Sequence, residues 1–427
     1  MKVVIVGYGP GGAAAASAAK MFDKSSEVII LTSEKSDAHR KPGAAMAFSS
    51  PDTEDLTIRD WSFDMLKKRG IQVISGVIVI EGSVKDKTLK YHDQKGNAKE
   101  ISFDRLILAT GGTPRLPKIP GTDLPGVYTI QDMPDASILG TNMDSIKKAV
   151  VVGAGFSGLE VAEKLHELGK EVHLIVRSRL MRRLLEPPMS EELQNRISKY
   201  ITLHIGKSPS EVIGSDKAEG IKVDDTVISA DAIIFMTGVL PKVDLANKLG
   251  LKIGKTGGIA VSSKMETSIK DVYAVGDCVE MVDPLTDEPI LMPIGSTAAR
   301  AGRQAGVAAV GGKKVYADLT LRLQYDRIFN TDIICVGHSS GTAGKIDLDP
   351  NVKYIEDPAE FSKAALITDK SGHLIGGQII SSRMGARVGY QIYNKVLSGA
   401  KLNDSPLLES THERLKDLIE SMFGPIQ

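Results

Sequence analysis

The chain has 427 residues, too many for one ordinary hydrophobic core, so its length predicts about two to four domains. It carries 53 basic and 53 acidic residues, and this zero net charge argues against broad nucleic-acid binding. Its two cysteines, Cys278 and Cys335, exclude a disulfide-rich scaffold and an iron–sulfur cluster held by cysteines of one chain, but leave one disulfide or a redox pair open. Glycine is in excess, at 42 residues, which directs attention to where the glycines lie.

The N-terminus contains no targeting signal. Only four apolar residues, 3–6, precede Gly7, whereas the core of a secretory signal needs roughly seven or more. No apolar stretch reaches the roughly 18 residues that span a bilayer. We therefore expect a cytoplasmic protein with no integral membrane segment. The eight histidines show no spacing typical of metal ligands, so we expect no metal site.

A first glycine cluster follows the apolar strand predicted over residues 3–6. Gly7, Gly9 and Gly12 have the spacing G-x-G-x-x-G, with Pro10 inside the loop, and an alanine-rich helix is predicted directly afterwards. In this strand–loop–helix order the glycines allow a tight turn, a close approach to a pyrophosphate and close helix packing. The free N–H groups of the helix N-terminus favour the phosphates. We expect a dinucleotide site here.

A second strand is predicted over residues 28–31, and its end should carry the group that binds the ribose. An acidic residue about 20 positions beyond the last glycine serves this purpose in dinucleotide-binding folds. Glu34 lies close to that spacing, while Thr32 occupies the nominal position. We favour Glu34 and keep Thr32 as the alternative.

A second copy of the pattern begins near residue 149. A buried strand over 149–152 leads into Gly153, Gly155 and Gly158, and a helix is predicted over 159–168. Two fingerprints in the right context predict two dinucleotide sites in one chain.

The strand over residues 172–176 ends on arginines rather than on an acid. Arg177 and Arg179 stand where a carboxylate would bind the ribose of NADH, and no carboxylate occurs before Glu186. Guanidinium groups at this point suit the 2′-phosphate of NADPH. The pattern favours NADPH over NADH, the alternative being that these arginines line a solvated loop with Arg182 and Arg183.

With both sites in view, the chain resembles the pyridine nucleotide–disulfide oxidoreductases, flavoproteins that bind two dinucleotides. The likeness covers about the first 312 residues and implies FAD in the first site and NADPH or NADH in the second. It further implies that the turns after the later strands contact the cofactors, and that Asp277 accepts hydrogen bonds from the flavin ribityl chain. The residues concerned are Ala109, Thr110, Gly111, Gly238, Gly276 and Asp277.

The resemblance implies an α/β fold with two Rossmann-like dinucleotide-binding domains and a C-terminal α+β domain. The FAD-binding domain would comprise residues 1–122 and 241–312, interrupted by an NAD(P)-binding domain over 123–240. Residues 313–427 resemble the interface domain of the NADH oxidase and coenzyme A disulfide reductase branch, which implies a homodimer. A structural appendage without dimerisation is the alternative.

The redox-active cysteine of that branch is missing here. The spacing places Pro42 and then Gly43 at its position, and no cysteine occurs before Cys278. A thiolate or sulfenic acid beside the flavin is therefore not available from this segment. Peroxidase-type members also have a histidine in the first glycine loop, where this chain has Pro10. Cys335 lies in a predicted apolar strand, so we expect it to be a small buried hydrophobic residue.

A basic segment takes the place of that cysteine. Arg40 and Lys41 resemble the basic residues near this point in ferredoxin and rubredoxin reductase-like members, which implies that Lys41 approaches the flavin N5 region. Phe156 matches an aromatic gate over the nicotinamide, and Glu160, one helical turn on, would pair with Lys41. A solvated loop lysine is the alternative for Lys41.

These features predict an FAD-dependent NAD(P)H oxidoreductase. Hydride from NAD(P)H would reach flavin N5, and electrons would then pass to a small-molecule acceptor or a small redox protein without a redox-active cysteine. An NADH oxidase-like or electron-transfer reductase fits best. A membrane-peripheral NADH–quinone reductase and a non-catalytic FAD/NAD(P)-binding redox sensor are the alternatives.

Overall fold

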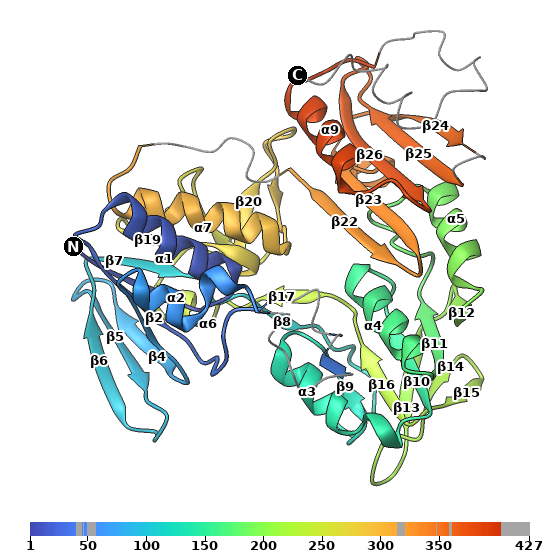
Figure 1. Cartoon of the computed structure of the whole chain (residues 1–427), viewed down its shortest axis with the longest axis horizontal. Coiled ribbons are helices and arrows are strands. Elements are labelled where there is room, and N and C mark those ends of the chain that lie inside the picture. The colour runs from blue at the N-terminus through green and yellow to red at the C-terminus, as the bar shows by residue number, and fades with distance from the viewer. Residues whose placement is uncertain are drawn as a thin grey trace. The chain divides into compact units, whose positions relative to one another are not determined.

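The computed structural model describes residues 1–39, 45, 47–48, 57–313, 321–346, 348–357 and 361–402. The chain forms two compact units (Figure 1). The first comprises residues 1–114, 131–133 and 239–320, and the second comprises 115–130, 134–238 and 321–427. The division into three domains expected from the sequence, with the FAD-binding domain in two segments, is finer than these two units and stays a prediction.

The first unit is built on a parallel sheet with the strand order β19-β7-β1-β2-β3. Apart from the edge strand β3, in which Gln72 is exposed, these strands are short apolar runs that are largely buried, as is typical of parallel sheets. Helix α1 (Pro10–Phe22) packs closely on α7 (Gly295–Ala309), since a Cβ at Gly302 or Gly306 would meet the backbone of α1. The strands are β1 (Lys2–Val6), β2 (Glu27–Leu31), β3 (Ile71–Ile74), β7 (Arg105–Leu108) and β19 (Val272–Ala274).

Smaller elements complete this unit. An antiparallel sheet consists of β4 (Ile78–Ser83), β5 (Thr88–His92) and β6 (Ala98–Ser102), and a ribbon consists of β8 (Gly112–Pro114) and β17 (Val239–Pro241). A third small sheet contains β18 (Ile259–Ala260), β20 (Val279–Val282) and β21 (Pro289–Ile290). The short helices are η3 (Arg59–Trp61), α2 (Phe63–Lys68), α6 (Asp244–Lys248) and η5 (Gly276–Cys278).

The second unit begins with a parallel sheet of the order β12-β11-β10-β16-β9, in which each strand has a counterpart in the first unit. Its strands are β9 (Val127–Tyr128), β10 (Lys148–Val152), β11 (Glu171–Val176), β12 (Thr202–Ile205) and β16 (Ala232–Phe235). Its helices are α3 (Met133–Thr141), η4 (Met143–Ser145), α4 (Phe156–Glu167) and α5 (Pro187–Ile197), and β13 (Pro209–Ile213), β14 (Gly220–Val223) and β15 (Thr226–Ser229) form a separate sheet.

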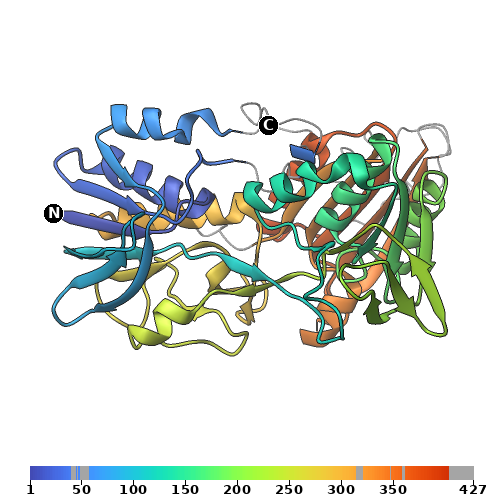
Figure 2. The same ribbon diagram turned by 90° about the horizontal axis from the view of Figure 1, so that it is seen from below.

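The C-terminal part of the second unit is an antiparallel sheet of the order β22-β23-β26-β25-β24. Helix α9 packs on β22, β23 and β26, α5 packs on β25 and β26, and α4 contacts β22 (Figure 2). The elements are β22 (Leu323–Ile328), β23 (Thr331–Gly337), α8 (Ser340–Ala343), η6 (Gly344–Ile346), β24 (Asn351–Asp357), β25 (Ser362–Thr368), β26 (Leu374–Ser381) and α9 (Ala386–Leu397).

The predicted α/β class, with two parallel Rossmann-like sheets and a C-terminal α+β part, is confirmed. Within the described ranges, no helix combines the length and the apolar character needed to cross a bilayer.

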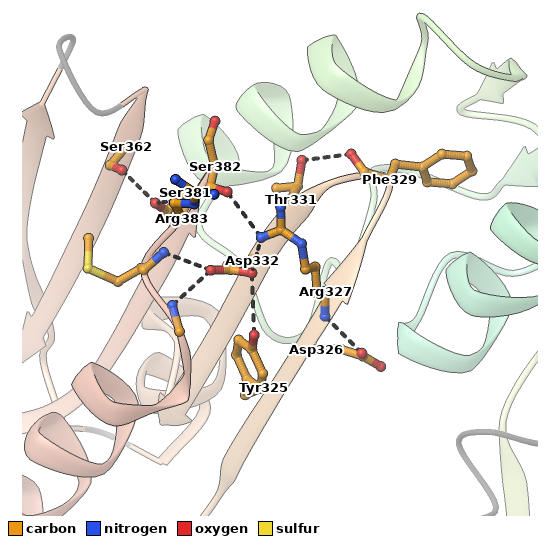
Figure 3. A network of polar contacts seen from close by, with 12 residues as sticks. Tyr325, Asp326, Arg327, Phe329, Thr331, Asp332, Ser362, Ser381, Ser382 and Arg383 are labelled. Atoms are coloured by element: carbon orange, nitrogen blue, oxygen red, sulfur yellow. Dashed lines mark hydrogen bonds and ion pairs between the residues drawn. The ribbon is translucent and has the colours of Figure 1, made fainter. Parts of the chain in front are cut away.

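A buried carboxylate fixes the start of α9 (Figure 3). The backbone N–H groups of Met384 and Gly385 donate to Asp332 Oδ2 at 2.7 and 2.8 Å. Arg327 donates to Asp332 Oδ1 at 2.7 Å, and the Tyr325 hydroxyl donates to the same atom at 3.4 Å. Burial alone would raise the pKa of Asp332, but these hydrogen bonds outweigh it and the pKa is lowered. The carboxylate therefore joins β22, β23 and α9.

Candidate functional site

The first glycine loop has the geometry that a dinucleotide needs. Gly7 has a φ of +109°, and a Cβ there would meet the carbonyl oxygen of Ala109. A Cβ on Gly12 would meet the carbonyl oxygen of Gly7, whereas a Cβ on Gly9 would meet nothing within 4 Å. Helix α1 begins at Pro10, directly after Gly9. The first and third glycines are thus required by packing, and the middle glycine leaves open space at a helix N-terminus.

The segments expected to contact FAD lie at one edge of the first sheet. The strands β1, β2, β7 and β19 run parallel, so their carboxyl ends meet at the same edge. A Cβ on Gly11 would lie 3.1 Å from Val275 Cγ2 and 3.7 Å from the N atom of Gly276, and a Cβ on Gly112 would lie 3.6 Å from Asp277 Cβ. The structure therefore brings the first glycine loop next to the segment 275–277, and the turn 109–112 next to both.

The two candidates for the ribose differ in their surroundings. Thr32 is buried, and its hydroxyl accepts a hydrogen bond from the N–H of Glu34 at 3.1 Å. Glu34 is half-buried beyond the end of β2. The Thr32 hydroxyl thus helps to shape the turn, and the choice between Thr32 and Glu34 as the ribose-binding residue stays a prediction. Arg40 and Lys41 lie outside the described residues.

Tyr8, inside the first glycine loop, has a structural role that the sequence did not reveal. Its ring is buried and stacks on Phe63 with ring centroids 5.0 Å apart. Its hydroxyl donates to the carbonyl oxygen of Trp61, and burial raises its pKa. The aromatic residue between two loop glycines was the available signal. Tyr8 ties the loop to the η3–α2 segment.

The second glycine loop repeats the first in detail. Gly153 has a φ of +114°, and a Cβ there would meet the carbonyl oxygen of Met236. A Cβ on Gly158 would meet the carbonyl oxygen of Gly153, and a Cβ on Gly155 would meet nothing within 4 Å. Gly238 has a φ of +103° and is equally open. The sequence-predicted loop residues thus lie at the carboxyl edge of β10 and β16.

Helix α4 carries the two predicted catalytic residues of this unit. Phe156 is its first residue and is buried. Burial and then a hydrogen bond with Asp326 of β22 raise the pKa of Glu160 to about 10, with a smaller contribution from Glu163. A pKa of about 10 keeps the Glu160 carboxyl protonated at neutral pH. The predicted pairing of Glu160 with Lys41 stays a prediction, because Lys41 is not among the described residues.

A loop rich in arginine follows β11. We call residues 177–186 the basic loop; its arginines are Arg177, Arg179, Arg182 and Arg183. Arg179 is half-buried and the other three are exposed. Burial and the charges of the other three arginines lower the pKa of Arg182. The N–H of Met181 donates to the carbonyl oxygen of Ala154 at 2.9 Å, which attaches the basic loop to the second glycine loop. An anion bound here would relieve the repulsion among the guanidinium groups.

Neither cysteine is a plausible thiolate. Neither Cys278 nor Cys335 forms a disulfide, and both are buried. Burial raises the pKa of Cys278 and raises that of Cys335 to about 12. Among the described residues, no group of histidine, cysteine and carboxylate side chains could hold a metal ion.

Comparison with known proteins gives a consistent result. The family model described as pyridine nucleotide-disulphide oxidoreductase matches residues 1–314. A NADH oxidase of Methanocaldococcus jannaschii is 32% identical over 409 residues, which cover 92% of this chain and 87% of that protein. An NAD(P)H coenzyme A polysulfide/persulfide reductase of Pyrococcus horikoshii is 27% identical over 399 residues, covering 91% and 89%. The solved NAD-dependent persulfide reductase from A. fulgidus superposes with a TM-score of 0.90 at 27% identity, covering 97% of this chain and 80% of that one.

Proposed function

Because the chain belongs to the pyridine nucleotide-disulphide oxidoreductase family, whose members include NAD(P)H-dependent oxidoreductases, we propose that it is an FAD-dependent NAD(P)H oxidoreductase that needs no redox-active cysteine. The family resemblance expected from the sequence is confirmed by the match to residues 1–314. The observation that carries the proposal is the pair of equivalent loops, in each of which the middle glycine faces open space at a helix N-terminus.

The first loop is the proposed FAD site. Gly9 would admit the pyrophosphate, Glu34 would bind the ribose of the adenosine, and Asp277 would accept hydrogen bonds from the ribityl chain. FAD, when bound, supplies an acceptor for hydride and a donor of electrons, and the protein supplies binding, orientation and electrostatics.

The second loop is the proposed site of the hydride donor. Gly155 would admit the pyrophosphate of NAD(P)H, and Arg177 and Arg179 of the basic loop would bind a 2′-phosphate. Phe156 would cover the nicotinamide pocket as an aromatic gate. Glu160, protonated at neutral pH, would hold a proton near the N-terminal turn of α4. NADPH is therefore the proposed donor, with NADH as the weaker one.

The acceptor is proposed to be a small molecule that reacts without a protein thiol. The two buried cysteines support this, since a raised pKa keeps a thiol from acting as a nucleophile or redox relay. The names of two relatives suggest which molecules to try first: one is a NADH oxidase and the other a coenzyme A polysulfide/persulfide reductase. We place dioxygen first and persulfide second. The C-terminal sheet is further proposed to build a homodimer, which sedimentation or light scattering would detect.

The test uses purified, FAD-loaded full-length protein mixed anaerobically with NADPH or NADH in a stopped-flow instrument. We expect rapid bleaching of the oxidised flavin band near about 450 nm, faster at low NADPH than at low NADH concentrations. Absence of bleaching with either nucleotide would reject the reductase in favour of a non-catalytic sensor. Bleached protein is then mixed with dioxygen, persulfide, quinone or ferricyanide, and the acceptor that restores the oxidised band fastest is identified.

Arg177→Glu tests the choice of nucleotide. A carboxylate in place of the guanidinium repels a 2′-phosphate, so the apparent affinity for NADPH should fall far more than that for NADH. Lys164→Glu makes the same kind of charge change at a half-buried position of α4, where Lys164 pairs with Glu167, and is the control. Equal losses for the two nucleotides in Arg177→Glu would refute the 2′-phosphate contact.

A further inference from the structure

Glu186, the last residue of the basic loop, is a buried carboxylate without a catalytic or cofactor role in the proposed function. Its side chain is 2% exposed, in a chain where most acidic residues face solvent. The N–H of Ser340 donates to Glu186 Oε1 at 2.6 Å, and the Ser340 hydroxyl donates to Oε2 at 2.5 Å. Ser340 is the first residue of α8, in the C-terminal part of the same compact unit. A buried carboxylate needs such partners, so the contact fixes both segments.

Two further hydrogen bonds hold the backbone of the basic loop from the C-terminal part. The N–H of Glu186 donates to Gln378 Oε1 at 2.7 Å, and Gln378 is 1% exposed in β26. The hydroxyl of Ser339 donates to the carbonyl oxygen of Arg183 at 3.2 Å. Both bonds restrain backbone atoms, so they act on the course of the loop rather than on one side chain. Neither restraint comes from the parallel sheet that carries the second glycine loop.

A further hydrogen bond within the loop links the position of an arginine side chain to the restrained backbone. The Arg179 guanidinium donates to the carbonyl oxygen of Arg182 at 2.8 Å, so its position depends on the backbone next to Arg183. Burial raises the pKa of Tyr354 on β24, with a smaller raising contribution from Glu186 and a lowering one from Arg179. Arg179 is thus anchored by the backbone of its own loop. A shift of the loop end would move this guanidinium.

We infer that Glu186 is a positioning residue for the basic loop, and that the C-terminal part of the chain, through Ser340 and Gln378, takes part in selecting NADPH over NADH. The inference rests on the proposed function, because it assumes that the arginines bind a 2′-phosphate. It assigns the selectivity to contacts made 154 and 192 residues further along the chain, outside the nucleotide-binding sheet. Glu186 acts through the arginines and does not touch the nucleotide.

The experiment compares two probes that differ only by a 2′-phosphate, adenosine 2′,5′-bisphosphate and adenosine 5′-monophosphate. Their affinities for the FAD-loaded full-length protein are measured by calorimetry, so that FAD blocks the first site and no turnover is needed. Ser340→Ala removes one hydrogen bond to Glu186. Ser340→Thr keeps the hydroxyl and is the rescue variant. Ser362→Ala is the matched control. Ser362 is a buried serine of β25, in the C-terminal antiparallel sheet, and its hydroxyl forms a hydrogen bond with the Ser381 hydroxyl at 2.6 Å.

We expect Ser340→Ala to lower the ratio of bisphosphate to monophosphate affinity by about three- to tenfold, the size of the net contribution of one ordinary hydrogen bond. Ser362→Ala and Ser340→Thr should keep the wild-type ratio. A partly unfolded variant lowers both affinities by the same factor, so the ratio separates positioning from loss of structure. In Arg179→Ala, the additional Ser340→Ala change should have little effect, since the group that it positions is gone.

Three results would overturn the inference, and they differ in what else they overturn. A wild-type protein that binds both probes equally rejects the 2′-phosphate site and this inference with it. A wild-type preference that survives unchanged in Ser340→Ala rejects only the role of Glu186 and the C-terminal part. An equal fall of the ratio in Ser340→Ala and Ser362→Ala would likewise reject it, because a general effect of the sheet would then suffice.

Discussion

Gly155→Ala should abolish tight NAD(P)H binding while leaving the fold intact. Gly155 is the N-cap of α4, with φ and ψ of −84° and −178°, a conformation open to any residue. A Cβ there meets nothing within 4 Å, so the new methyl group meets no protein atom and lies in the space proposed for the pyrophosphate. The same change at Gly158 is the contrasting case, because its Cβ would run into the carbonyl oxygen of Gly153.

The expected magnitudes follow from these environments. For Gly155→Ala, the loss of unfolded-state entropy stabilises by about 0.4–1 kcal/mol, and the poorer N-cap offsets part of this, so the free energy of unfolding should change by less than about 0.5 kcal/mol. Accommodating a methyl group against a tightly bound ligand resembles overpacking, which costs about 1–3 kcal/mol. Affinity for NAD(P)H should then fall about 5- to 150-fold. Gly158→Ala should instead lower the free energy of unfolding by about 1–3 kcal/mol.

The assay combines denaturant unfolding with titration of NADPH into anaerobic, FAD-loaded protein. Gly9→Ala provides a matched comparison in the first loop, since its Cβ also meets nothing within 4 Å, and there FAD retention should fall instead. A Gly155→Ala protein of normal stability that binds NADPH as tightly as the wild type would refute the assignment of this loop. So would loss of FAD from Gly155→Ala and of NADPH from Gly9→Ala.

Three further predictions rest on buried groups. A thiol-blocking reagent should leave NADPH turnover unchanged, because burial raises the pKa of both Cys278 and Cys335; inactivation in step with labelling would contradict this. As the pH rises from 6 to 9, Glu160→Gln should gain stability relative to the wild type. The unfolded Glu160 loses its proton near its usual pKa, whereas the folded one keeps it up to a pKa of about 10, so wild-type stability falls as the pH rises. The prediction is refuted if the free energies of unfolding of the two proteins differ by the same amount at pH 6 and at pH 9. Asp332→Asn should cost about 2–4 kcal/mol at pH 7. This difference should shrink as the pH falls below about 3.9, because the unfolded carboxyl then takes up a proton while the folded one, whose pKa is lowered, keeps its charge to lower pH; an unchanged difference at pH 3 would show that the charge is not what matters.

The parts of the fold that depend on local sequence could be predicted. Both glycine loops, their strands and the helices after them follow from the order of residues within about 30 positions, because strand, turn and helix signals are local. The structure gives Gly7 and Gly153 the positive φ values and Gly9 and Gly155 the open space that the spacing implies.

The contacts that the sequence could not reveal join residues far apart in the chain. Asp326 bonds Glu160 from β22, and Ser340 and Gln378 bond Glu186 from 154 and 192 positions away. Sequence periodicity does not predict such a pairing, because in the sequence a buried carboxylate cannot be distinguished from a surface one. Tyr8 was missed for a related reason, because its partner Trp61 follows 53 residues later.

Because the two parallel sheets have matching strand orders, the protein must distinguish two similar cofactors at two similar sites. FAD and NADPH both contain adenosine and a pyrophosphate, and two loops with the same glycine geometry cannot distinguish those shared parts. The sheets differ where their second strands end: Glu34 follows β2, and Arg177 and Arg179 follow β11. The acid at the first site would repel a 2′-phosphate, and the arginines at the second site would attract it, so each site would favour its own cofactor. Under the proposed function, fidelity of cofactor loading in this protein would depend on charge at two strand ends rather than on the loops themselves.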